Sequence, residues 1–102
     1  MKLVTVEQIP GEYEVLGMVS GSVVQSKHIG RDFMAGMKTL VGGEIKGYTE
    51  MLYEARNIAT NRMIEQAKSL GADTIIGIRY GSSSVMDGAA EVLAYGTAIK
   101  TL

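Results

Sequence analysis

The sequence contains no cysteine, and this absence excludes several classes of protein. Without a thiol, the chain cannot form a disulfide scaffold, a thiolate zinc site or a cysteine nucleophile. Small domains that lack disulfides are common in reducing compartments, so we expect a cytoplasmic protein.

Long apolar runs and clusters of basic residues are missing as well. No stretch approaches the roughly 20 apolar residues of a membrane span, so we expect no membrane segment. The N-terminal stretch MKLVTVEQIPGEYE lacks the long apolar segment of a signal peptide. The ten lysines and arginines form no run and the formal net charge is −1, which argues against a nucleic-acid-binding protein.

The composition is that of an ordinary globular domain. Of 102 residues, 46% are hydrophobic and 21% are charged, which predicts a single domain over residues 1–102. A domain of this size buries only about two-thirds of its unfolded surface. Its core is therefore thin unless a partner adds to it.

The first half of the chain predicts two strands and a short helix. Residues 3–7 and 13–24 are rich in β-branched and apolar side chains, which indicates strands. Gly17 and Gly21 interrupt the second strand, and each is expected to mark a bend or a close approach of another backbone. Apolar side chains at helical spacing in residues 29–41 predict a short first helix.

Residues 47–70 predict one long amphipathic helix. Their apolar side chains recur at spacings of three and four, which forms a single stripe. Glu50 and Glu54 lie near the start and Lys68 near the end, as the helix dipole favours. Gly71 follows, where a left-handed cap is expected.

Two strands close the chain. Residues 73–80 and 90–100 indicate strands, and the glycine- and serine-rich residues 81–88 indicate a loop that joins them as a hairpin. Alternate side chains of the last strand differ in size, because one face carries Val92, Ala94, Gly96 and Ala98 and the other carries Leu93, Tyr95, Thr97 and Ile99.

The sheet is therefore expected to be apolar on both faces, whereas one long helix covers only one of them. Uncovered apolar surface usually marks an interface, so we expect a homo-oligomer whose second subunit covers the other face. The alternative is that the short helix at residues 29–41 folds over this face.

Gly42 and Gly43 precede the long helix, where backbone N–H groups can hold a phosphate. The residues after them do not include the lysine and hydroxyl residue of a Walker loop, and the G-x-G-x-x-G pattern is absent. Glu44 would repel an anion, and Lys46 is the one nearby cation. The pair is thus better interpreted as a turn, with a phosphate site as the alternative.

His28, the only histidine, and Asp32 lie four residues apart and could place two metal ligands on one helix face. A zinc or copper site would need further ligands, which a symmetric neighbour could supply; the alternative is a surface or capping histidine. Arg31 and Asp32 are also predicted to meet Arg56 of the long helix. This network could bind an anion or only lock the two helices.

Nucleophilic catalysis has little support. The stretch MVSGS does not match the G-x-S-x-G turn of serine hydrolases. The consecutive serines at residues 82–84 lie far along the chain from His28. We therefore expect no enzymatic activity, and the sequence names no cofactor.

Several motifs together resemble one family. HIGRDFMAGMKTLVGG followed by GYTEMLYEAR, then AKSLGADTIIGI and YGTAIK, with LGMVSG in the first long strand, is similar to the YbjQ-like family. The resemblance implies a dodecin-like β-α-β-β subunit of the α+β class, with an antiparallel sheet on one main helix and extra short strands that help assembly. It further implies a homopentamer and carries a heavy-metal-binding label. Leu16 stands where some relatives have cysteine, and Glu44 where some have a basic residue.

These observations predict a cytoplasmic homo-oligomer that binds a metal ion or small anion at a site between subunits. The alternative is a structural or interaction protein without a small-molecule ligand. The candidate residues are His28 for a metal and Arg31, Asp32, Glu44 and Arg56 for binding.

Overall fold

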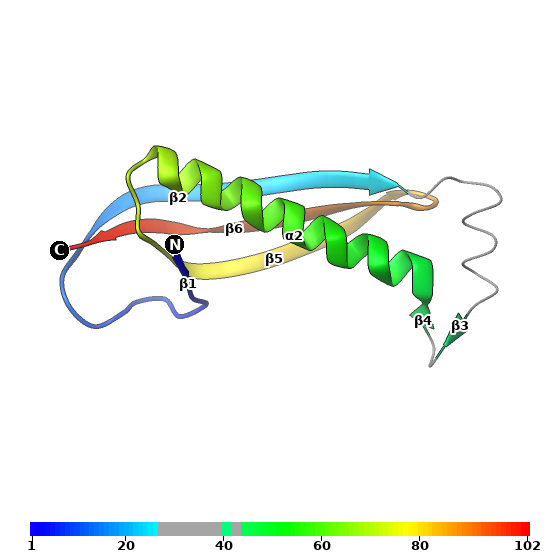
Figure 1. Ribbon diagram of the computed structural model, residues 1–102, viewed down its shortest axis with the longest axis horizontal. Coiled ribbons are helices and arrows are strands. Elements are labelled where there is room, and N and C mark those ends of the chain that lie inside the picture. The colour runs from blue at the N-terminus through cyan, green and yellow to red at the C-terminus, as the bar shows by residue number, and fades with distance from the viewer. Residues whose placement is uncertain (27–39, 42–43) are drawn as a thin grey trace.

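The structure is a computed structural model that describes residues 1–26, 40–41 and 44–102 (Figure 1). The fold is α+β, as predicted, with one long helix lying across a sheet (Figure 1). In chain order the elements are β1 (Lys2–Leu3), β2 (Tyr13–Ser26), β3 (Leu40–Val41), β4 (Glu44–Ile45), α2 (Lys46–Ser69), β5 (Thr74–Met86) and β6 (Ala89–Thr101).

The main sheet has the strand order β1-β5-β6-β2. The three long strands are antiparallel, as predicted, and give the expected β-α-β-β sequence of β2, α2, β5 and β6. β1 instead pairs with β5 in parallel, so the expectation of a fully antiparallel sheet is wrong at this edge. A tight turn forces two strands to run antiparallel, but most of the chain separates β1 from β5 and leaves the direction free.

The N-terminal segment continues along β5 beyond the two residues of β1. The Val4 N–H donates to the Ile75 carbonyl at 3.0 Å, and the Gly77 N–H donates to the Val6 carbonyl at 2.7 Å. This agrees with the strand predicted over residues 3–7, although the regular pairing is shorter. Arg79 ties the same segment down, because its guanidinium donates to the Glu7 carboxylate at 2.8 Å.

The loop predicted at residues 81–88 is wrong. Residues 81–86 continue β5 and pair with β6, from Gly81 opposite Leu93 to Met86 opposite Ala89. Only Asp87 and Gly88 form the turn, and Gly88 has a positive φ of 76°, which glycine adopts without strain. Glycine and serine favour turns locally, but the backbone hydrogen bonds of the ladder override that preference here.

The short helix predicted at residues 29–41 is wrong at its end, because Leu40–Val41 is β3 and pairs with β4. Residues 29–39, and Gly42 and Gly43 with the turn predicted there, lie outside the described residues.

The long helix is confirmed to within a residue at each end. Its C-terminus closes as predicted, because Gly71 has a φ of 85° and donates to the Lys68 carbonyl, while Ala72 donates to the Ala67 carbonyl. Lys68 lies in the last turn, but the first turn contains no acidic residue, since the helix begins at Lys46 and Glu50 falls in its second turn.

The core lies between α2 and the face of the sheet that it covers. The helix contributes small residues and one methionine, all completely buried: Ala55, Ala59, Met63 and Ala67. They pack against strand residues of β2, β5 and β6: Val19, Val23, Ile75, Ile78, Val92, Ala94 and Ala98. The predicted helix stripe and the small face of the last strand are therefore the two halves of this core.

Both glycines of β2 have the predicted roles. Gly17 has a φ of 135° and lies where the β2–β6 register shifts, which makes it a bulge. Gly21 is where the helix backbone comes closest, because a Cβ there would collide with the Ala59 carbonyl and the Met63 N–H.

The other face of the sheet, which we call the open face, carries exposed apolar side chains among polar ones such as Ser20 and Glu91, and it is only partly covered. Ile76 and Ile99 are buried at the end where the N-terminal segment is hydrogen-bonded. Farther along, Met18, Val24 and Tyr95 are 78%, 60% and 41% exposed. The predicted apolar second face is thus present in part, and much of it meets solvent in the single chain.

Candidate functional site

Of the five predicted site residues, the structure places the side chain of one. His28, Arg31 and Asp32 lie outside the described residues. Glu44 is the first residue of β4. Arg56 lies in the N-terminal half of α2 and is exposed to solvent. The predicted contact of Arg56 with Arg31 and Asp32 stays a prediction.

Arg56 borders a hollow of about 160 Å³ between α2 and β5. The helix supplies Leu52 and Arg56, which are four residues apart and therefore share one face. The strands supply the rest of the lining, namely Tyr80, Gly81, Ser82 and Val92. Tyr80 and Ser82 alternate along β5, and Ser82 pairs with Val92, so these side chains lie on the helix-covered face of the sheet.

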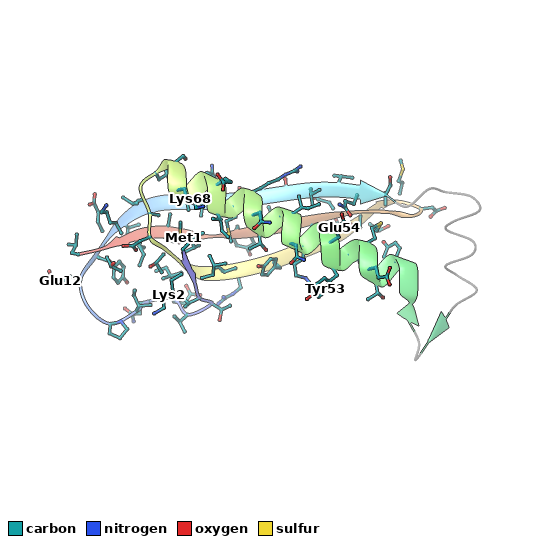
Figure 2. All side chains as sticks on the ribbon, in the orientation of Figure 1. Met1, Lys2, Glu12, Tyr53, Glu54 and Lys68 are labelled. Carbon is teal, nitrogen blue, oxygen red and sulfur yellow. The ribbon has the colours of Figure 1, made fainter. Side chains whose placement is uncertain are left out.

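The Arg56 side chain is held beside an aromatic ring. Its guanidinium carbon lies 5.7 Å from the centre of the Tyr53 ring, which is within the range of a cation–π contact. Tyr53 projects from α2 on the side of β5 (Figure 2). Within the part of the chain that the structure describes, no carboxylate lies within ion-pair distance of Arg56.

A chain of hydrogen bonds links the helix to Tyr80. Thr60 Oγ1 donates to the Arg56 carbonyl at 2.8 Å and lies 2.8 Å from the Tyr80 hydroxyl. Thr60 has one hydroxyl proton, and the Arg56 carbonyl can only accept, so the Tyr80 hydroxyl donates to Thr60. The ring of Tyr80 is thereby fixed as a wall of the hollow.

The sequence missed Tyr80 and Ser82 as site residues. Ser82 was assigned to a loop, and only the extension of β5 past Tyr80 brings it under α2. The usable signal was the alternation of Tyr80, Ser82 and Ser84, which has the period of a strand.

One carboxylate with a shifted pKa lies elsewhere, just before β5. Asp73 accepts hydrogen bonds from the hydroxyl and the N–H of Thr101 and from the hydroxyl of Thr74. These bonds, with that from the Thr101 side chain the strongest contributor, lower the pKa of Asp73 below its ordinary value of 3.8. The contacts join the start of β5 to the end of β6, so we assign Asp73 a structural role.

A family model described as "Putative heavy-metal-binding" (YbjQ) matches residues 1–102. This chain belongs to the YbjQ family. Among its relatives, a UPF0145 protein of Helicobacter hepaticus is 69% identical, with 100% of this chain and 99% of the relative covered. A UPF0145 protein of Thermotoga maritima is 65% identical, with 98% and 96% covered. The resemblance inferred from the motifs is thus confirmed.

A solved structure supports the YbjQ fold. The crystal structure of a protein of unknown function of the DUF74 family from Pediococcus pentosaceus superposes with a TM-score of 0.69. The two sequences are 21% identical, and the match covers 100% of this chain and 98% of that one. At this identity the similarity establishes the fold alone.

The YbjQ family is described as metal-binding, but the side chains of residues 1–26 and 47–102 form no cluster of metal ligands. Across the described residues, no three side chains of histidine, cysteine, aspartate or glutamate gather as metal ligands. His28, the predicted ligand, lies outside them. Among the described helices, none is long and apolar enough to cross a membrane.

Proposed function

We propose that this YbjQ-family protein is a cytoplasmic, non-enzymatic homo-oligomer that binds a small anion at a site bordered by two subunits. The observation that carries the proposal is the hollow beside Arg56, where an exposed guanidinium faces no carboxylate of the described chain. Guanidinium groups present paired N–H donors that match the oxygens of carboxylates and phosphates.

The other described arginines make the contrast clear. Arg62 donates to the Ser22 carbonyl at 2.7 Å, and Arg79 donates to the Thr5 carbonyl and to Glu7. Both therefore hold parts of the fold together. Within the described residues the Arg56 guanidinium has no such contact apart from the Tyr53 ring, and we assign its donors to a ligand.

The open face supports the homo-oligomer. Met18, Val24 and Tyr95 expose apolar surface on one side of a sheet whose other side is already covered by α2. Burying apolar surface contributes a free energy of about 25 cal/mol per Å², which would favour association of copies through this face. The pentamer is the assembly that the family resemblance implies.

The position of the hollow favours a site shared between subunits. β1 pairs with Thr74 and Ile75 only, so from Tyr80 onward the outer edge of β5 has no strand partner in the described chain. The hollow lies along this part of β5. A neighbouring subunit that packs against the edge would add a further wall to it.

Metal binding is the second candidate, and the family description favours it. It would use His28 and Asp32, which lie four residues apart, with further ligands supplied by a symmetric neighbour. We rank it below the anion, because the described residues offer a cation without a partner and no cluster of metal ligands. A structural or interaction protein without a ligand is the remaining alternative.

Native mass spectrometry with added acetate, phosphate, zinc, copper or nickel tests the proposal. We expect an oligomer that gains the mass of an anion, and we expect Arg56→Gln to abolish this gain. Lys68→Gln is the matched control, since it removes an exposed positive charge of the same helix away from the hollow. A gain with zinc, copper or nickel alone would favour the metal site, and no gain with any addition would favour the protein without a ligand.

A further inference from the structure

The lining of the hollow beside Arg56 is partly polar and partly apolar. Arg56 and Ser82 supply hydrogen-bond donors, whereas Leu52, Val92 and the ring of Tyr80 supply apolar surface. A hydrated inorganic anion would leave the apolar surface in contact with water. A ligand with an anionic end and an apolar body would use both parts, which is the usual make-up of a small-molecule site.

The volume of the hollow limits the size of such a ligand. It measures about 160 Å³. An apolar cavity of about 150 Å³ is large enough to bind benzene. The hollow therefore has room for a body of about one six-membered ring, and its open side leaves a charged group free to reach Arg56.

The donors that remain suit a single negative charge. The Tyr80 hydroxyl already donates to Thr60, so it cannot also donate to an anion. Arg56 is left as the one cation of the lining, with the Ser82 hydroxyl as a neutral donor. One guanidinium and one hydroxyl can satisfy a carboxylate, whereas a phosphate dianion would keep uncompensated charge.

The Tyr53 ring adds geometric selectivity. Because it lies against the guanidinium, it limits the orientations that Arg56 can adopt. A planar fork that is oriented in this way can form two parallel hydrogen bonds with a carboxylate.

We propose that the ligand class of this site is a small monocarboxylic acid with a flat apolar body, about the size of benzoate. This inference rests on the proposed function, because it takes the anion site at Arg56 as given. The carboxylate pairs with Arg56 and accepts from Ser82, and the body lies between Leu52, Val92 and the ring of Tyr80.

Titration of the full-length oligomer, followed by NMR of its amides and methyl groups, tests the inference with three probes: benzoate, benzyl alcohol and inorganic phosphate. We expect benzoate to shift the signals of Leu52, Tyr80 and Val92. Benzyl alcohol has the same ring without the charge and should bind at least about tenfold more weakly, because a hydrogen bond to a charged group contributes about that much. Arg56→Gln should weaken benzoate to the level of benzyl alcohol, and Lys68→Gln should not change it.

The outcomes separate this inference from the anion site itself. If phosphate binds through Arg56 and benzoate does not, the anion site stands and the carboxylic acid is wrong. If neither binds, both proposals fail. Equal binding of benzoate and benzyl alcohol would mean only apolar contact and would also overturn the inference. Should Arg56→Gln lose its fold by circular dichroism, Arg56→Lys keeps the charge without the planar fork, and undiminished benzoate binding in it would count against the paired geometry.

Discussion

At the scale of single residues, one glycine sets the distance between the helix and the sheet. Gly21 of β2 lies under α2, where an added Cβ would meet backbone atoms of Ala59 and Met63 and would come within 2.8 Å of the Arg62 Cβ. Backbone atoms cannot turn away as a flexible side chain can. The helix would have to move, and with it the completely buried contacts of Ala55 and Ala59.

We therefore expect Gly21→Ala to lower the free energy of unfolding by about 1–3 kcal/mol or more, as overpacking does. Urea denaturation measures this loss. Gly81→Ala is the matched control, because a Cβ at Gly81 has no heavy atom within 4 Å and the residue has no positive φ. It should change stability by no more than about 0.5 kcal/mol. Equal losses in the two variants would show that the close approach at Gly21 is not what limits the side chain.

Asp73 provides a residue-scale prediction about pH. Its pKa is lowered in the folded state, so its contribution to stability is present above the ordinary value of 3.8 and is lost as pH falls through the folded value. Asp73→Asn should be less stable than the natural protein at about pH 7, and the difference should shrink at about pH 3. Urea midpoints of both proteins at the two pH values measure it. A constant difference would mean that the Thr101 contacts do not depend on the charge.

At the scale of the elements, α2 protects one edge of the sheet. β2 is an edge strand, and its outward N–H and C=O groups could pair with another chain. Gln66 accepts from the Ser20 N–H at 2.7 Å, and Arg62 donates to the Ser22 carbonyl at 2.7 Å. The helix thus holds β2 by polar contacts at its edge as well as by apolar contacts beneath it.

Gln66→Ala should lower the free energy of unfolding by about 0.5–1.5 kcal/mol, the usual net value of one hydrogen bond. It should also speed hydrogen exchange at the Ser20 amide. The neighbouring Glu65→Ala serves as a control, since Glu65 only pairs with Lys68 at 3.7 Å across exposed side chains. Such surface pairs contribute little, so exchange at Ser20 should stay as it is. Unchanged exchange in Gln66→Ala would show that this contact does not protect β2.

The elements that could be predicted from sequence are those with a local signal. The stripe of α2, the cap at Gly71 and the alternation in β6 each lie within a few turns or residues of chain, and each is confirmed. The outer half of β5 was missed, because its glycine and serines favour turns and only pairing with β6 makes them a strand. The direction of β1 was missed for a related reason, since its partner Thr74 is distant in sequence.

The residues of the candidate site also differ in whether the sequence could predict them. Arg56 was named from sequence as a predicted partner of Arg31 and Asp32, which lie outside the described residues. Its neighbours Tyr80 and Ser82 could not be named, because they reach the hollow only through the crossing of β5 under α2. A site formed by tertiary contacts leaves little trace in the spacing of residues.

At the scale of the whole molecule, the sheet has one face that is covered by α2 and one open face. The covered face carries Val92, Ala94 and Ala98, all buried under α2. The open face carries Met18 and Val24 of β2 beside Tyr95 of β6, all exposed in the single chain. A thin domain of 102 residues gains most from burying such a face against another copy of itself.

Tyr95→Asp should therefore dissociate the homo-oligomer, because it would place a carboxylate without a partner inside an apolar interface. Size-exclusion chromatography with light scattering measures the mass, and circular dichroism checks that the subunit keeps its fold. Asn61→Asp is the matched control, since it adds the same charge at an exposed position of α2 that is neither on the open face nor in the lining of the hollow. It should leave the mass unchanged. An intact assembly in Tyr95→Asp would mean that the copies meet elsewhere, and the unpaired outer edge of β5 would then be the next surface to substitute.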